Sequence, residues 1–218
     1  MLQAMDVAKY FMKEDPNSYQ NTLDSNIKLQ KMLFFAQLIS LSEREEPLYS
    51  DSIRAFEHGC VVECVRLRYR DEFVELRKES LAFTPEFSES EYAVLGLARE
   101  IFGRLSAQEL SDLNHSLSCW SKFHVRSESS TGYHDKDLAI IPTEELLAEV
   151  DRMRSVLEMY RAGVNDNMLE RNINGVTFSY APDFEMSDKI IQELEEFARV
   201  ADEGAYGVYL DEGELVVY

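Results

Sequence analysis

The stretch NIKLQKMLFFAQLISL, residues 26–41, constrains the fold more than any other part of this sequence. It carries a dense apolar stripe at helical spacing, which indicates a helix with a well-packed face. Ser25 is a suitable N-cap residue for such a helix, because its hydroxyl can accept a hydrogen bond from a first-turn amide. We expect a central core helix here, with Leu33 and Phe34 among its buried residues.

Polar residues interrupt this stripe at its start, where Lys28, Gln30 and Lys31 follow one another closely. Long side chains near the first turn can cover the core with their aliphatic stems while their polar ends stay hydrated. The two lysines then serve either a contact with a partner or an internal ion pair. Both alternatives are open at this point, and Lys28 and Lys31 are candidate partner-binding residues.

Further helices follow from periodicity and from capping signals. Apolar residues recur at helical steps over 2–13, and TEELLAEVDRMRSVLEMY after Pro142 continues a helix that Gly163 would end. Ser88 with Glu91, and Ser106 with Glu109, fit capping boxes. EEPLYSDSIRAFEHG has no period, so we expect a loop there that leads into a short helix over VVECVRLRYR.

The residue pattern changes from helical to partly β-rich after about residue 162. A strand over 175–180, an amphipathic helix from Ser187 and two strands about a turn at 211–213 predict a β-α-β-β appendage. The predicted fold is therefore mainly α, with a compact helical domain at 1–162 and an α+β character overall. The appendage, 163–218, should pack on that domain, because a small sheet with one helix has little core of its own.

The appendage is also acidic, with thirteen Asp and Glu residues against three basic ones, so it carries 10 of the 19 net negative charges. A solvated flank is one explanation of this charge. The other is an acidic face that meets a basic partner and fixes partner choice. On that second interpretation the candidate contact residues are Glu195, Glu196 and Glu212.

The composition of the whole chain excludes some classes of function. A net charge of -19 argues against binding through nucleic-acid phosphates and favours basic protein partners or mimicry of nucleic acid. No apolar run is long enough for a membrane span, and the N-terminus is not that of a signal peptide. Three cysteines do not form a disulfide framework, so we expect a cytoplasmic protein.

Two groups of residues suggest reactive chemistry. His58, Cys60 and Cys64 could supply three zinc ligands, but zinc usually takes four in paired spacings, and no second pair is present. Cys119 and His115 would meet only if one helix carried both. Because no catalytic motif is present, we expect no enzymatic activity, no cofactor and no metal.

Several stretches together resemble the Panacea domain, the SocA-like antitoxin family of bacteria and phages. The run KLQKMLFFAQ matches the most specific motif of the family, K-L-Q-K-[LM]-L-[YF]-[YF]-A-Q. The segments DVAKYF, PLYSDSIRAFEHGCVV, LSDLNHSLSCW and TEELLAEV match others in the same order over about the first 160 residues. In the family pattern Phe56 stands where tryptophan is frequent and Cys60 where proline is usual, so the turn around Gly59 can be built differently.

The resemblance implies an antitoxin that neutralises a cognate toxin by direct contact. It also implies an alternative, an adaptor that delivers the bound toxin to a protease. The family motifs single out Phe56, Gly59 and Trp120 as structural residues, together with Leu33 and Phe34 in the KLQK run. His58 joins Lys28 and Lys31 as a candidate contact on the helical domain, and the oligomeric state stays open, a homo-oligomer included.

Overall fold

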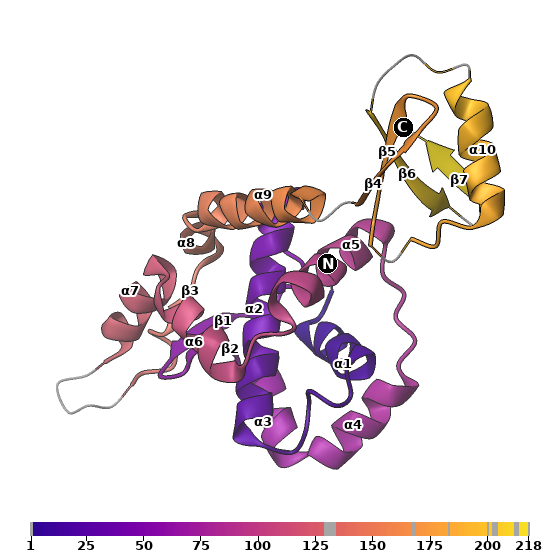
Figure 1. Ribbon diagram of the computed structural model, residues 1–218. Helices are drawn as coiled ribbons and strands as arrows, with labels where there is room; N and C mark the ends of the chain where they lie inside the picture. Colours follow the sequence, from indigo (N-terminus) through magenta and orange to yellow (C-terminus); the bar gives the residue numbers. More distant parts are fainter. Residues whose placement is uncertain are drawn as a thin grey trace. The chain divides into compact units, whose positions relative to one another are not determined.

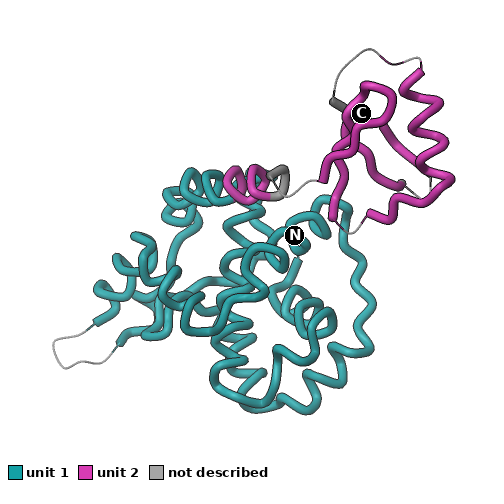
Figure 2. Tube along the Cα trace, in the orientation of Figure 1, with its two compact units in different colours: residues 1–156 teal, residues 157–218 magenta. Residues whose placement is uncertain are grey.

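The chain folds into two compact units, Met1–Val156 and Leu157–Tyr218, in the computed structural model (Figure 2). The structure describes residues 2–128, 134–166, 169–182, 184–199, 201, 205–211 and 214–217. Its helices and strands confirm the predicted class, mainly α with a small β-containing appendage. Within the described residues no helix has the length and apolar character that a bilayer span requires.

Helices make up most of unit 1 (Figure 1). They are α1 (Ala4–Glu14), α2 (Leu23–Arg44), α3 (Glu63–Asp71), α4 (Phe73–Ala82), α5 (Glu89–Phe102), α6 (Ala107–His115), α7 (Ser118–Ser127), α8 (Thr143–Leu147) and α9 (Val150–Asp166), which continues past residue 156. The strands β1 (Ile53–Phe56), β2 (Gly59–Val62) and β3 (Ile140–Ile141) form a small antiparallel sheet in the order β2-β1-β3.

Helix α2 runs through the middle of unit 1, where it contacts α1, α3, α5, α6 and β2 (Figure 1). Every residue from Leu29 to Ser42 is buried, Leu33 and Phe34 among them. A helix buried over this length carries apolar side chains on most of its faces, which explains the dense stripe, and its buried polar side chains Gln30, Lys31 and Gln37 make hydrogen bonds. The central-helix prediction is confirmed, although Thr22 and not Ser25 is the N-cap: the Thr22 hydroxyl accepts from the Ser25 amide at 3.1 Å.

Both predicted capping boxes are present. The Ser88 and Ser106 hydroxyls accept hydrogen bonds from the amides of Glu91 and Glu109, and each glutamate accepts from the amide of its own serine. Each box satisfies two amides that would otherwise have no partner inside the helix. These pairs fix the first residues of α5 and α6.

The loop expected over 45–59 is present only up to residue 52, because β1 and β2 form a hairpin from Ile53 onward. Phe56 pairs with Gly59, so only Glu57 and His58 make the turn, and the short helix begins at Glu63 after β2 has ended. Both strands have only four residues. Strands this short give a weak periodic signal, and that is why the sequence pattern did not reveal them.

The single helix expected after Pro142 is two helices, α8 and α9, with Glu149 in the break between them. Glu149 is 5% exposed, and its carboxylate accepts from the Ser118 hydroxyl at 2.6 Å and the Cys119 amide at 2.9 Å. It thereby caps the start of α7, whose peptide dipoles favour a negative charge. Gly163 lies inside α9 and does not end it.

Unit 2 contains a four-stranded sheet and one helix. Its elements are β4 (Leu169–Ile173), β5 (Val176–Tyr180), α10 (Asp188–Ala198), β6 (Ala205–Asp211) and β7 (Glu214–Val217). The strand order is β4-β5-β6-β7, and α10 connects the parallel pair β5 and β6. The structure thus adds β4 to the predicted strands, joined to β5 through an Asn174–Gly175 turn in which both residues have positive φ.

One face of this sheet packs against α10. The shared cluster contains Phe178 and Leu194, both with no exposed surface, together with Ile173, Val176, Ile190, Ala198 and Val208. Unit 2 therefore has a hydrophobic core of its own, which the sequence analysis did not expect. Its packing on the helical domain stays a prediction, as does the domain boundary at residue 162.

Candidate functional site

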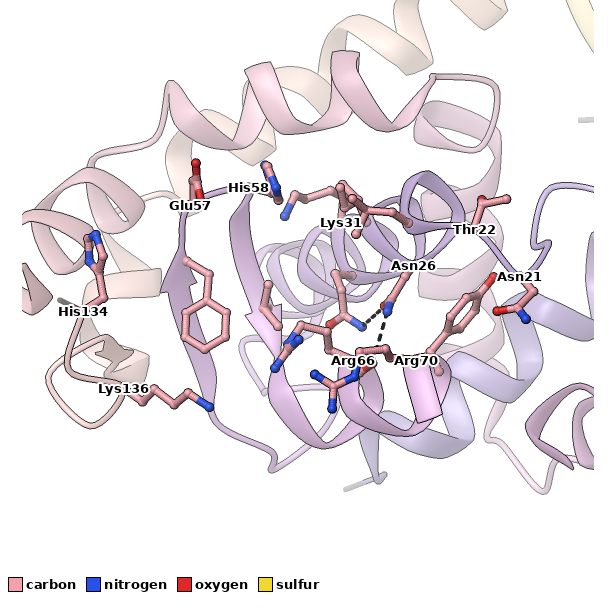
Figure 3. Close-up of a pocket in the computed structure, with 16 residues that line it drawn as sticks. Asn21, Thr22, Asn26, Lys31, Glu57, His58, Arg66, Arg70, His134 and Lys136 are labelled. Atoms are coloured by element: carbon pink, nitrogen blue, oxygen red, sulfur yellow. Dashed lines mark hydrogen bonds between the residues drawn. The ribbon is translucent and has the colours of Figure 1, made fainter. Parts of the chain in front are cut away.

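A cavity of about 530 Å³ opens in unit 1 between the first half of α2, the β1–β2 hairpin and α3 (Figure 3). Its apolar wall comes from Leu23, Ile27, Phe56, Val61 and Tyr69. Cavities of this size, mostly apolar with a few polar groups, are typical of sites that bind small molecules. Three of the residues singled out by sequence, Lys31, Phe56 and His58, line it.

The outward edge of β2 determines how this region is built. The Cys60 amide donates to Asn114 Oδ1 at 2.5 Å, the Cys60 carbonyl accepts from Lys31 Nζ at 3.0 Å, and the Val62 amide donates to Gln30 Oε1 at 2.9 Å. An edge strand would otherwise expose these groups. Gln30 and Lys31 of the KLQK run therefore hold the hairpin against α2.

Lys31 itself is completely buried, with 0% of its surface exposed. Burial lowers the pKa of its ammonium to about 8, because a charged amine loses hydration there, while the neighbouring Cys60 acts in the opposite direction. Of the two explanations offered for the lysines, the internal ion pair is wrong for Lys31, because among the described residues its ammonium pairs with no carboxylate and donates to a backbone carbonyl. Its role as a partner contact stays a prediction.

Lys28 has a related structural use. Its ammonium donates to the carbonyl oxygen of Gly103 at 2.7 Å, and Gly103 is the C-cap of α5. A cation at the last carbonyls of a helix is stabilising, because these groups carry the negative end of the helix dipole. Lys28 is half-buried, so part of its stem stays accessible next to this contact.

Gly59 allows the close approach of α2 and α6 to the hairpin. Its φ is +97°, and a Cβ there would lie 2.3 Å from Asn114 Oδ1 and 2.8 Å from Lys31 Nζ. Both the backbone and the space around it therefore require glycine. The departures from the family pattern left the structure of the turn around Gly59 undetermined. It is the two-residue turn of the β1–β2 hairpin, and Cys60 follows in β2, where its amide donates a hydrogen bond to Asn114 Oδ1.

Trp120 supports the same hairpin from the other side. Its indole Nε1 donates to the Phe56 carbonyl at 2.8 Å, and its ring lies between His115 and His124, with centroids at 4.1 and 4.8 Å. His124 in turn lies 4.6 Å from the His134 ring. Burial lowers the pKa of His115 and of His124 and favours their neutral form in this series of rings.

Cations gather around the cavity. Lys31, Arg66, Arg70 and Lys136 line it, against the single carboxylate of Glu57. Figure 3 shows these side chains arranged around the open space. The sequence VRLRYR contains a signal for this group of cations, because Arg66 and Arg70 are four residues apart and share a helix face. Sequence reasoning missed it because the contribution of Lys136 comes from a distant segment.

Glu63 is a carboxylate shared by two of these basic groups, Arg66 and Lys136, and by Arg54 on β1. It lies 3.6 Å from Arg54, 3.5 Å from Arg66 and 2.5 Å from Lys136. Burial alone would raise the pKa of Glu63, but the hydrogen bond and charge of Lys136, with the two guanidinium groups, hold it below its usual value. Glu63 thus balances only part of the charge of three cations, while Arg70 has a carboxylate partner of its own in Asp71.

The residues considered for a metal or thiol site do not converge. Cys60 is buried, and Cys64 donates to Asp51 Oδ1 at 3.3 Å, where partial burial and that carboxylate raise the pKa of its thiol to about 11. The pKa of Cys119 is also raised, by contact with Cys60 first and by burial. In the part of the chain that the structure describes, no three His, Cys, Asp or Glu side chains are arranged to hold a metal.

His115 and Cys119 do not share one helix, because α6 ends at His115 and α7 begins at Ser118. The pair therefore lacks the continuous helix that its contact was expected to need. Of the candidate contacts in unit 2, Glu195 is half-buried and Glu196 exposed on α10, and Glu212 lies outside the described residues. The structure does not test their role in binding.

Comparison with known proteins gives one family. Residues 29–121 match the family model described as antitoxin SocA-like, Panacea domain. The resemblance inferred from the KLQK run is confirmed over this segment, which comprises most of α2, the β1–β2 hairpin, α3 to α6 and the start of α7. The chain gave no match in comparisons with curated proteins and with solved structures.

Proposed function

We propose that the protein is an antitoxin that binds and neutralises a cognate toxin by direct protein–protein contact, as in type II toxin–antitoxin systems. The observation that carries the proposal is the match of residues 29–121 to the SocA-like Panacea domain. The residues of this segment build the most specific structural feature of unit 1, the hairpin held by Gln30, Lys31 and Asn114.

The charge of the chain supports this proposal. A net charge of -19 favours association with a basic partner, because complementary potentials raise the rate of encounter. The raised pKa values of the Cys64 and Cys119 thiols disfavour the thiolate that covalent catalysis needs. A binding role thus agrees with the chemistry of the described residues better than a thiol-dependent reaction does.

Two surfaces remain proposals for the toxin contact. One is the acidic face of unit 2, with Glu195, Glu196 and Glu212. The other is the helical unit around Lys28, Lys31 and His58, of which only His58 is exposed, while the two lysines make internal hydrogen bonds. We favour the acidic face, with the Panacea-like segment as its scaffold.

Expression in bacteria tests the proposal. Each gene that flanks the gene for this protein in its genome is induced alone and together with it. We expect one neighbour to arrest growth and co-expression of this protein to restore it, with the two products eluting together from a size-exclusion column. If no neighbour is toxic, or if growth stays arrested in the presence of this protein, the antitoxin proposal is wrong.

The alternative is a proteolytic adaptor that delivers its bound toxin to a protease. The two modes differ in the fate of the toxin: sequestration leaves its amount unchanged, whereas delivery shortens its half-life. A pulse-chase measurement of the toxin with and without this protein separates them. The three free cysteines agree with a cytoplasmic location for either mode, and light scattering of the purified protein decides whether it is a homo-oligomer.

The rival from another class is a metal- or thiol-dependent enzyme that uses His58, Cys60 and Cys64. Replacement of Cys60, Cys64 and Cys119 together by Ser should leave neutralisation intact apart from a loss of stability, because two of these thiols are buried packing residues. Growth rescue by the triple variant is the measurement. A well-folded triple variant that fails to rescue, or stoichiometric metal in the purified protein, would favour the enzyme.

A further inference from the structure

The charged side chains that line the cavity beside α2 are mainly cationic. Four cationic side chains line it, Lys31, Arg66, Arg70 and Lys136, in a chain whose net charge is -19. Their concentration around one concave site therefore makes that site a local receptor for negative charge.

The hydrogen-bonding capacity of these cations is only partly used. Arg66 Nε is buried and has no partner among the described residues, although the guanidinium also approaches Glu63 and lies 5.7 Å from the centre of the Phe56 ring. Arg70, by contrast, already pairs with Asp71, whose oxygens accept from its Nε at 2.6 Å and from its Nη2 at 2.8 Å. Donors that are buried or half-buried without acceptors are costly, and a bound oxyanion would satisfy them.

The walls and size of the cavity define the remainder of the ligand. Phe56 and Tyr69 supply aromatic surface, with Ile27 and Val61 beside them, around a volume of about 530 Å³. This volume lies within the range for small organic ligands. A polyanion such as a nucleic acid would instead meet the repulsion of the whole acidic surface.

We propose that this cavity binds a small organic anion, in which a carboxylate or phosphate is carried on an apolar or aromatic body. The oxyanion meets Arg66 and Lys136, and the body packs against Phe56 and Tyr69. Guanidinium groups recognise both oxyanions with paired hydrogen bonds. This ligand site does not depend on the antitoxin proposal, although Lys31 and His58, which line the cavity, are also candidates for the toxin contact.

Isothermal titration calorimetry on the full chain tests the proposal, with phenyl phosphate and benzoate as probes at millimolar concentration. Inorganic phosphate and phenol are the comparison compounds, because inorganic phosphate lacks the aromatic body and phenol lacks the negative charge. We expect saturable binding of at least one aromatic oxyanion, and at least about tenfold weaker binding of its two comparison compounds, the loss expected for one charge-assisted contact. The tighter probe identifies the oxyanion as phosphate or carboxylate.

Two lysine variants provide a matched pair. Lys136 lines the cavity and pairs with Glu63, whereas Lys122 lies outside it and pairs with Glu145; their side chains are 55% and 59% exposed. Lys136→Gln should weaken binding of the tighter probe about tenfold, and Lys122→Gln should leave it unchanged. Both variants should unfold at the wild-type temperature, because both positions are exposed.

Three results would overturn the proposal. The first is the absence of saturable binding for both aromatic probes. The second is equal affinity for phenyl phosphate and inorganic phosphate, which would make the apolar wall irrelevant. The third is an equal effect of Lys136→Gln and Lys122→Gln, which would show general attraction to surface charge and no binding in the cavity.

Discussion

Gly59 is a residue at which even a small side chain should destabilise the fold. Gly59→Ala would place a methyl group 2.3 Å from Asn114 Oδ1 and force a side chain into a backbone with φ of +97°. We expect the free energy of unfolding to fall by more than about 1 kcal/mol, measured by urea denaturation. Gly96→Ala is the control: nothing lies within 4 Å of a Cβ there, so this helical site should gain about 0.5–1 kcal/mol.

Lys31 should make stability depend on pH in an unusual direction. Its pKa falls from about 10.5 in the unfolded chain to about 8 in the folded protein. Between these two pH values the unfolded state binds more protons, so the free energy of unfolding rises with pH. The destabilisation is fully present below about pH 8 and is relieved as the pH rises towards 10.5.

The comparison variant is Lys31→Met, which keeps the stem and removes the charge. The free energy of unfolding of the wild type, minus that of the variant, should rise by on the order of 2 kcal/mol between about pH 7 and pH 10. The tyrosines that titrate in this range are common to both proteins and cancel in the difference. If the difference stays constant across this pH range, burial does not lower the pKa of Lys31 to about 8 in the folded protein.

At the scale of elements, α2 should dominate the stability of unit 1. Leu33→Ala or Phe34→Ala should lower the free energy of unfolding by about 2–5 kcal/mol, because a buried large-to-small change loses transfer energy and leaves a cavity. Leu23→Ala lies on the same helix but is 66% exposed, so it should cost less than about 0.5 kcal/mol. An unchanged unfolding midpoint for the two core variants would contradict the central position of α2.

The sequence predicted those elements whose signals are local. The capping boxes at Ser88 and Ser106 and the apolar run of α2 lie within a few residues of the structure that they specify. The β1–β2 hairpin was missed because its stabilising partners are distant: Lys31 is 29 residues from Cys60, and Asn114 is 54 residues from it. Strand β4 had a local signal, the Asn174–Gly175 turn, which indicates a hairpin.

The candidate site was predictable only in part, for the same reason. Phe56 and His58 were identified from family motifs and do line the cavity. Its charge depends on Arg66, Arg70 and Lys136, which come together only when the segment after residue 133 reaches α3. Residue spacing within a single helix or strand cannot predict that side chains from such distant segments lie close together.

At the scale of the whole molecule, charge should control association with the toxin. Reversal of Glu195, Glu196 and Glu212 to Lys removes much of the acidic character of unit 2, so association should slow and lose salt dependence while the protein stays folded. Stopped-flow kinetics at low and physiological salt is the measurement. The control reverses three exposed glutamates of unit 1, Glu75, Glu86 and Glu89, with the same change of net charge.

The control variant shows whether association depends on a contact at the acidic face of unit 2 or only on the net charge of the whole protein. If both triple variants slow association equally, net charge alone acts. If the unit 2 variant binds with unchanged kinetics, the toxin contact lies on the helical unit near His58.

The side chains that cover β2 restrict the way in which any partner can attach to this sheet. Many proteins recognise an extended segment by adding it as a further strand to an open edge. Here the Cys60 and Val62 groups that such a strand would need already bond to Asn114, Lys31 and Gln30. A toxin that binds at this end of the hairpin must therefore contact side chains such as His58. The specificity of that contact would depend on the shape and charge of the side chains and not on backbone pairing.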